Sequence, residues 1–410
     1  MVSGSFKEVS SNPNNPNWEK HIDRQYELYP REGDIRSQYE RDYTRILHSL
    51  AYRRLKHKTQ VFFNIQNDHI CTRMEHVQHV ESVSCTIAKH LGLNIELTRA
   101  IAMGHDLGHA PFGHEGEVEL SKIMLELNLD KFWHERNGLR IIDDIEMLQD
   151  DKRNYHNLNL TYAVRDGIIS HCGEVNENGI FPRGEAINLA LFRSSGEFQA
   201  FTWEGCVVKI SDKIAYLGRD IDDAIQMHFI DYSDLRKLTK IAKKYGEQAI
   251  NTTVTIHNFI IDICENSSPN NGIKLSDKYC SMLNEIRDFN TIAIYRNSKF
   301  DTYRKYAALI IRSIFEFLYC EYDGENTVNN LLRLYKPYPT MINDFLQHIN
   351  RLSEIQPQEI KYKKALEKYK NNKIYGNLGS NLVYAQAIID YISGMTDRYA
   401  ISVFNELTQY

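Results

Sequence analysis

The block Met103–Glu117 constrains this chain more than any other stretch of its sequence. It reads Met-Gly-His-Asp-Leu-Gly-His-Ala-Pro-Phe-Gly-His-Glu-Gly-Glu and gathers histidines and carboxylates among glycines and a proline. The residues that lead into it, 94–103, are apolar at helical spacing, which predicts a helix with His105 and Asp106 in its last turn. An imidazole and a carboxylate side by side at a helix end can both reach a metal ion beyond that end.

The second half of the block predicts that the first helix ends and that a new helix follows. Gly108 and Pro111 are typical of a helix end, and His114 is expected to open the next helix with Glu115 and Glu117 in its first turn. The alternative is a helix–loop–helix corner whose histidines only bond backbone carbonyls. The density of ligand-type residues favours a metal site over that corner.

The composition favours a helical protein from a reducing compartment. The chain has 410 residues, enough for one large domain or two to three smaller ones, and Gly and Pro are sparse. Its formal net charge is −5 with interspersed signs, so the sequence as a whole indicates neither a nucleic-acid-binding nor a membrane protein. The seven cysteines form no C-x-x-C pair, which argues against a disulfide framework or a thiolate zinc site.

No stretch has the pattern of a targeting or membrane segment. Residues 1–20 are polar and rich in Asn, Ser and Pro, unlike a secretory signal. The most apolar later run, residues 306–320, contains Arg312 and Glu316 and is too short to cross a bilayer. We therefore expect a soluble, cytoplasmic protein.

We expect an all-α fold in three parts: an N-terminal arm over residues 1–33, a core over 34–230 and a helical region over 231–410 that packs on the core. A small β-hairpin is expected where two short apolar runs flank Gln66-Asn67-Asp68. Strand–helix alternation and internal repeats are not seen, which argues against a Rossmann-type sheet. Helical periodicity predicts helices over residues 35–57, 72–91, 94–103, 115–127, 134–147, 160–171, 205–228, 232–265, 273–296, 299–320, 339–352, 357–370 and 379–405.

Three of these predicted helices carry polar residues that the apolar pattern does not explain. On the helix over 72–91, Arg73 and His76 lie one turn apart and away from the apolar side. The helix over 205–228 has apolar residues on one side, while the other side carries Asp212, Tyr216, Asp220 and Asp223. The helix over 35–57 ends in a basic run, Arg53-Arg54-Leu55-Lys56-His57-Lys58, which is either a solvated face or a grip on phosphate.

These residues resemble the H…HD…D signature of the HD-domain phosphohydrolases and, more narrowly, the deoxyguanosine triphosphate triphosphohydrolase family. The resemblance covers about residues 35–230, and its long Gly104–Glu117 block is far more specific than the H…HD…D signature alone. It implies an HD-domain helical core with a helical C-terminal extension. The matching segments are Arg53–Phe62, Thr72–His76, Gly104–Glu117, Leu158–Tyr162, Arg165–Gly167 and Asp212–Tyr216, with Tyr295–Ser298 in the C-terminal third.

The resemblance implies hydrolysis of a deoxynucleoside triphosphate, dGTP or several dNTPs, to the deoxynucleoside and inorganic triphosphate. One divalent metal ion would be held by His76, His105, Asp106 and Asp212. Two imidazoles and two carboxylates suit Mn, Fe, Co, Ni, Zn or Mg. Such an ion stabilises charge developing on phosphorus and lowers the pKa of bound water.

The remaining site residues also follow from the resemblance. His114 matches the family's catalytic histidine, and Glu117 would orient it. The phosphate contacts map to Arg73, His109, His134 and Lys213. The sugar contacts map to Gln60, Tyr216 and Asp220, and we place Arg296 and Tyr303 at the far rim of the pocket.

The sequence departs from the family pattern at several positions. The family's Phe-Glu-His-Asn is here Phe132-Trp133-His134-Glu135, and acidic residues common around the last metal ligand are replaced by Lys209 and Lys213. The second replacement resembles the eukaryotic dNTP triphosphohydrolases and puts a strict preference for dGTP in doubt.

Two alternatives stay open at this point. One is another HD-domain nucleotidase or phosphodiesterase, and the other is a non-catalytic nucleotide-sensing or nucleic-acid-binding oligomer. The resemblance further implies a homo-oligomer, hexameric or tetrameric, with a second dNTP as a possible activator and single-stranded DNA as a possible partner.

Overall fold

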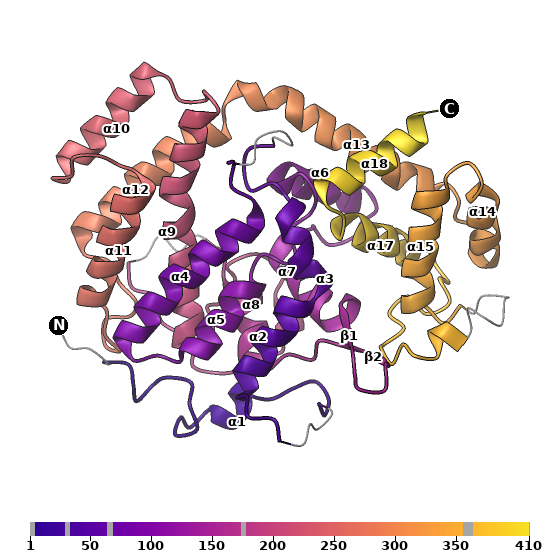
Figure 1. Cartoon of the computed structure of the whole chain (residues 1–410), viewed down its shortest axis with the longest axis horizontal. Helices are drawn as coiled ribbons and strands as arrows, with labels where there is room; N and C mark the ends of the chain where they lie inside the picture. Colours follow the sequence, from indigo (N-terminus) through magenta and orange to yellow (C-terminus); the bar gives the residue numbers. More distant parts are fainter. Residues whose placement is uncertain (1–4, 29–32, 64–68, 174–177, 356–363, 410) are drawn as a thin grey trace. The chain divides into compact units, whose positions relative to one another are not determined.

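Figure 1 shows a computed structural model of the chain, which describes residues 5–28, 33–63, 69–173, 178–355 and 364–409. Helices dominate the described residues, which confirms the predicted all-α class. The strands among them are β1 (Met147–Gln149) and β2 (Tyr155–Asn157), which pair antiparallel with Leu148 opposite His156. Among the described residues, every helix is too short or too polar to traverse a lipid bilayer.

The chain forms two compact units, and each is built from segments far apart in the sequence. The first unit comprises Met1–Leu47, Gln60–Asp106 and Leu160–Tyr303. Within it, α4, α5, α8 and α9 pack against one another, and α11 packs on α4 and α9. Its helices are α1 (Trp18–His21), α2 (Gln38–His48), α4 (Arg73–Leu91), α5 (Ile95–Gly104), α8 (Tyr162–Ser170), α9 (Trp203–Gln226), α10 (Tyr232–Lys244), α11 (Thr252–Asn266) and α12 (Asp277–Asn290).

The second unit comprises His48–Thr59, Leu107–Asn159 and Arg304–Tyr410. Within it, α15 packs on α14, α17 and α18, and the β-hairpin follows α7. Its helices are α3 (Leu50–Arg54), α6 (Gly113–Glu126), α7 (His134–Arg140), α13 (Asp301–Tyr319), α14 (Thr327–Leu334), α15 (Pro339–Leu352), α17 (Asn381–Ser393) and α18 (Asp397–Thr408). The predicted three-part division into arm, core and C-terminal region is not tested by these two units and stays a prediction.

The helices that carry the predicted site begin and end at residues with clear local reasons. α4 begins with a capping box, in which Thr72 accepts from the backbone N–H of Glu75 and the Glu75 carboxylate accepts from that of Thr72. It ends at Gly92, whose φ of 84° is in the left-handed region that glycine tolerates. Side-chain oxygens of Asn94 and Thr202 cap the first turns of α5 and α9 in the same way.

Several of the described N-terminal residues are anchored in the interior of the first unit. Phe6 is fully buried and its ring meets Trp203 edge to face. Ser10 and Ser11 are buried too, and both donate hydrogen bonds to the Glu204 carboxylate at the start of α9. The Asn-, Ser- and Pro-rich composition does not predict this anchoring, because only a few residues provide it.

Part of the basic run Arg53–Lys58 forms hydrogen bonds within the second unit. Arg54 donates to Glu146 at 2.6 Å, and the buried Lys58 ammonium donates to the backbone carbonyls of His109 and Ser393. Arg53 and His57 are exposed. A grip on phosphate by the whole run is therefore not what the structure shows.

Several predicted elements differ in extent from the observed ones. The helix predicted over 232–265 is two helices, because the chain turns at Gly246 with a φ of 77°. The helix predicted over 379–405 breaks between α17 and α18, and α14 was not predicted. The hairpin expected around Gln66-Asn67-Asp68 has its tip outside the described residues and stays a prediction. Most of the helix predicted over 357–370 also lies outside the described residues.

Candidate metal and phosphate site

Three predicted metal ligands meet in the first unit. His76 lies on α4, His105 directly follows α5 and Asp212 lies on α9. One ligand atom from each of these side chains lies within 4.8 Å of the other two. The His76 Nε2 is 2.9 Å from the Asp212 Oδ1, and the His105 Nε2 is 3.8 Å from the same oxygen. The sequence predicts that these three side chains lie close together, and in the structure they do.

His105 is oriented as a ligand by the end of α5. Its Nδ1 lies 2.6 Å from the carbonyl oxygen of Ala102, so the Nδ1–H donates there and the Nε2 keeps its lone pair. The side chain is fully buried, and its Nε2 has no hydrogen-bond partner among the described residues. A buried, unpartnered nitrogen costs free energy, and a cation would satisfy it.

Asp106 completes the predicted set from the residue after His105. Its Oδ1 is 3.6 Å from the His105 Nε2, and its Oδ2 accepts a hydrogen bond of 2.9 Å from Arg73. The two ligand atoms of an ion that binds each at about 2.1 Å lie about 3–4 Å apart. The separations of 3.6 and 3.8 Å between the His105 nitrogen and its two carboxylate neighbours fit that spacing.

The charges of this cluster are coupled. Burial alone would raise the pKa of Asp212, but the hydrogen bond and charge of His76 outweigh it and hold that pKa well below its usual range. Burial would lower the pKa of His76, but Asp212 outweighs it in turn and raises that pKa. A metal ion needs the neutral form of His76, so its binding would compete with the proton that Asp212 favours on this imidazole.

The residues predicted to contact the sugar lie in the same unit. Asp220 is buried and accepts a 2.5 Å hydrogen bond from the Tyr295 hydroxyl, and burial raises its pKa to about 7. The side-chain oxygen of Gln60 is buried and has no hydrogen-bond partner in the described part of the chain. Tyr216 is half-buried on α9. The polar side of this helix, which an exposed surface would explain, is instead covered at Asp220, because α9 packs against α4, α5, α8, α11 and α12.

The other predicted residues of the first unit lie toward its surface. Lys213 is half-buried on α9, and Arg296 is exposed just after α12 and its π-helical last turn, Thr291–Tyr295. Tyr303 is half-buried and stacks on Phe63 with ring centroids 5.3 Å apart. Their roles as phosphate and rim contacts stay predictions.

The histidines predicted to act on phosphate lie in the second unit. His114 opens α6 as expected, and its side chain is 81% exposed. Glu117 lies one turn later, but its carboxylate bonds His134, accepting from the backbone N–H and lying 3.1 Å from the Nδ1. The His114 Nδ1 is 3.9 Å from Glu117. His109 stacks on His134 with ring centroids 3.7 Å apart.

These side chains form a polarised group around one carboxylate. Burial alone would raise the pKa of Glu117, but the charge and hydrogen bond of His134 outweigh it and hold that pKa well below its usual range. Glu117 is therefore an anion in contact with His134. That arrangement can bind phosphate and exchange protons near neutral pH.

The loop between the motif histidines is fixed within the second unit. Phe112 has a φ of 63°, which a bulky residue rarely adopts, and its backbone N–H donates to the Asp397 carboxylate at 2.8 Å. The other oxygen of Asp397 accepts from the backbone N–H of Thr59. Gly108 lies so close to α7 that an added Cβ would be 1.9 Å from the carbonyl oxygen of His134.

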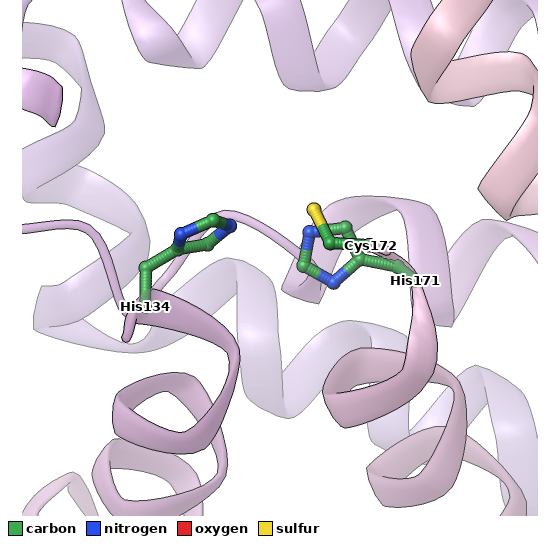
Figure 2. A group of neighbouring side chains, drawn as sticks. All are labelled: His134, His171 and Cys172. Carbon is green, nitrogen blue, oxygen red and sulfur yellow. The ribbon is translucent and has the colours of Figure 1, made fainter. Parts of the chain in front are cut away.

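Two residues that sequence reasoning missed lie beside the predicted ones. Tyr295 bonds Asp220, and its place in the matching segment Tyr295–Ser298 was the available signal. His171 follows α8, and one ligand atom from each of His105, Asp106 and His171 lies within 4.8 Å of the other two. Figure 2 shows His171 and Cys172 where α8 ends, and His134 where α7 begins. A lone histidine at a helix end gave no signal in the sequence.

A separate cavity of about 480 Å³ lies in the second unit and includes none of the predicted site residues in its lining. Arg54, His348 and Tyr399 are among the residues that line it.

Comparison with known proteins places this arrangement in a family. The HD domain family matches residues 73–217, and the phosphohydrolase-associated domain family matches residues 362–406. The HD match includes all four predicted metal ligands.

Relatives are similar over most of the chain. A protein of Caldanaerobacter subterraneus subsp. tengcongensis named deoxyguanosinetriphosphate triphosphohydrolase-like protein is 32% identical over 91% of this chain and 86% of its own length. A protein of the same name from Clostridium tetani is 32% identical over 92% of this chain and 87% of its own. A third, from Desulfatibacillum aliphaticivorans, is 37% identical over 64% of this chain and 68% of its own. The chain therefore belongs to the deoxyguanosinetriphosphate triphosphohydrolase-like family of HD-domain phosphohydrolases.

Proposed function

We propose that this protein hydrolyses deoxynucleoside triphosphates, dGTP or several dNTPs, to the deoxynucleoside and inorganic triphosphate with the help of one divalent cation. The observation that carries the proposal is the cluster of the buried His76 and His105 with the half-buried Asp212, with Asp106 beside it. The names of the relatives support the substrate class.

The cluster has the donor chemistry of a divalent-cation site. His76, His105, Asp106 and Asp212 would hold the ion, which would supply charge stabilisation at phosphorus and lower the pKa of bound water. Mn, Fe, Co, Ni, Zn and Mg all accept such ligands to different degrees. The Arg73 guanidinium donates to Asp106 and would fix that carboxylate. Its other N–H groups would donate to a phosphate oxygen.

The other side chains would bind and orient the substrate. His109, His134 and Lys213 would neutralise phosphate oxygens, and His114 would exchange a proton near the α-phosphate. Glu117 would hold the His134 imidazole in place through the contact with its Nδ1. This role differs from a direct hydrogen bond to His114, because the Glu117 carboxylate is engaged by His134.

Sugar recognition would rest on Gln60, Tyr216 and Asp220. The buried, unpartnered oxygen of Gln60 needs a donor, and a 3′-hydroxyl provides one. Tyr295 would hold Asp220 in place through its short hydrogen bond. Arg296 and Tyr303 would form the rim.

The test is an assay of all four dNTPs, singly and in pairs, with Mn²⁺, Mg²⁺ and Co²⁺. We expect release of inorganic triphosphate by the wild type and loss of activity in Asp106→Ala, with the exposed Asp151→Ala as the matched control. Release of pyrophosphate or monophosphate would instead identify another HD-domain nucleotidase or phosphodiesterase. No hydrolysis of any dNTP under any of these conditions would favour a non-catalytic nucleotide sensor.

Assembly and activation belong to the same proposal. A homo-oligomer, hexameric or tetrameric, and stimulation by a second dNTP are expected, with binding of single-stranded DNA as a further possibility to test. The mass in solution with and without dNTP tests the first, and faster turnover in dNTP pairs than in single dNTPs tests the second. A monomer in both conditions would contradict the oligomer.

A further inference from the structure

We infer that His171 is a further protein ligand of the divalent cation, which makes the centre rich in imidazole and selective for transition metals over Mg²⁺. This inference rests on the proposed metal centre at His76, His105, Asp106 and Asp212. It adds a residue that the H…HD…D signature does not contain.

His171 and His105 occupy the same position on two neighbouring helices. α5 ends at Gly104 and α8 ends at Ser170, so each histidine is the first residue after its helix. Both continue the right-handed backbone, with φ and ψ of −61° and −36° at His105 and −68° and −32° at His171. The two side chains therefore leave their helices in equivalent directions.

Both imidazoles are also oriented by the same hydrogen bond. The Nδ1 of His105 lies 2.6 Å from the carbonyl oxygen of Ala102, and the Nδ1 of His171 lies 2.7 Å from that of Ile168. In each case the carbonyl belongs to the residue three positions earlier. A carbonyl can only accept, so Nδ1 carries a hydrogen and, in the neutral ring, Nε2 carries the lone pair. This is the orientation that metal-binding histidines commonly have.

Close packing of the two helices brings the rings together. A Cβ added at Gly104 would lie 2.6 Å from the Ile168 side chain, and one added at Gly167 would lie 2.5 Å from the Ile101 side chain. The two glycines therefore admit the apolar side chains of the opposite helix. At the end of this contact, the His105 and His171 rings lie with centroids 4.9 Å apart at an interplanar angle of 76°.

Asp106 provides the carboxylate that joins the two imidazoles into one site. One ligand atom from each of His105, Asp106 and His171 lies within 4.8 Å of the other two, and all three side chains are buried. His105 also belongs to the cluster with His76 and Asp212. His105 is therefore the residue that the two groups share.

The ligand set decides the chemical class of the ion. Imidazole suits Mn, Fe, Co, Ni and Zn, whereas Mg²⁺ prefers an all-oxygen shell and gives up water reluctantly. Three imidazoles and two carboxylates therefore favour a transition metal. Removing one imidazole should weaken Co²⁺ binding far more than Mg²⁺ binding.

The experiment measures metal binding directly on the full, metal-free chain, without substrate. Calorimetric titration gives the Kd for Co²⁺ and for Mg²⁺, and the visible absorption of bound Co²⁺ reports its ligands. The variants are His171→Phe, which keeps a ring against His105, and His171→Gln, which is smaller and polar. The matched control is His79→Gln, which removes a half-buried imidazole of α4 outside both clusters. Circular dichroism of each metal-free variant selects those that fold.

We expect His171→Phe and His171→Gln to weaken Co²⁺ binding by about 10-fold or more and to change its absorption spectrum, since even residues outside the ligand shell cost about 10–100-fold. The Kd for Mg²⁺ and the control should change little. An unchanged Co²⁺ Kd and spectrum in either folded variant would overturn the inference, even if turnover fell. If the wild type binds neither Co²⁺ nor Mn²⁺, the proposed function fails as well, so the two failures are distinguishable.

Discussion

At the scale of single residues, a proposed metal ligand of the first unit and the proposed catalytic histidine of the second unit differ in exposure. His105 is fully buried with its Nε2 unpartnered among the described residues, whereas the His114 side chain is 81% exposed. Buried ligands are pre-oriented, and loss of one affects both metal binding and stability. An exposed side chain at a helix start contributes little to stability, so its removal isolates a chemical role.

His114→Ala should therefore lose turnover without losing metal or stability. General acid–base help is worth about 10²–10⁴ in rate, so we expect kcat to fall by that factor. The Kd for Mn²⁺ and the melting temperature should match the wild type, because the side chain is mostly in solvent. His57→Ala, which removes another exposed histidine of the same unit, is the control. Equal kcat in His114→Ala would exclude it from the chemistry.

Asp220 should make the stability of the metal-free chain depend on pH. Burial raises the pKa of Asp220 to about 7, against 3.8 for an ordinary aspartate, so the folded chain keeps a proton that the unfolded chain releases. This stabilisation is complete below about pH 4 and is lost as the pH rises through about 7. Between pH 5.5 and 8 the loss amounts to about 2 kcal/mol.

Urea unfolding with a chelator present, at pH 5.5 and at pH 8, measures this loss. The wild type should lose free energy of unfolding between the two, and Asp220→Asn should lose about 2 kcal/mol less because it cannot ionise. The same pH dependence in both proteins would show that the Asp220 carboxyl does not titrate in this range.

At the scale of elements, the predicted site depends on close contacts of short loops with helix ends. The loop that carries His109 passes α7 at Gly108, where an added Cβ would lie 1.9 Å from the His134 carbonyl oxygen and 2.2 Å from the Gly138 nitrogen. Both neighbours are backbone atoms, which cannot move aside without shifting α7. The glycine is therefore required by the close approach.

Gly108→Ala should consequently displace the loop and reduce activity together with stability. Overpacking of this kind costs about 1–3 kcal/mol or more, and the stacking of His109 on His134 should be disturbed as well. Thermal unfolding and kcat measure the two effects. Gly184→Ala is the control, since an added Cβ there meets nothing within 4 Å. Wild-type behaviour of Gly108→Ala would mean that the loop lies farther from α7.

Helix periodicity and motif spacing predicted the helices and their polar residues. They did not predict the contacts between residues that lie far apart in the sequence. The proposed metal ligands could be picked out because His105-Asp106 lies in a dense motif and because Asp212 breaks the expected mixture of charges on a helix face. The role of Asp397 could not be predicted, because its carboxylate accepts from the Phe112 backbone N–H, 285 residues away in the sequence. His171 was missed for a similar reason: its partner is another helix end, and spacing along the chain does not show that.

At the scale of the whole molecule, segments distant in sequence support the helix that carries Asp212. The Glu204 carboxylate, in the first turn of α9, accepts hydrogen bonds from the Ser10 hydroxyl and from the backbone N–H groups of Ser11 and Asn94. Glu204 is fully buried, and burial raises its pKa despite these donors. The N-terminal segment, the start of α5 and the start of α9 thus share one carboxylate.

Glu204→Ala should destabilise the protein by several kcal/mol, because it leaves two buried backbone N–H groups without an acceptor at about 1–3 kcal/mol each. Glu204→Gln keeps an acceptor oxygen and should cost less, while the exposed Glu185→Ala should be neutral. Urea unfolding measures the loss, and Co²⁺ titration of the folded fraction should give a Kd within about threefold of the wild type, since Glu204 contacts none of the proposed ligands. Wild-type stability of Glu204→Ala would mean that the N-terminal segment is a loosely attached arm after all. A large loss of Co²⁺ affinity at unchanged stability would instead make Glu204 part of the site.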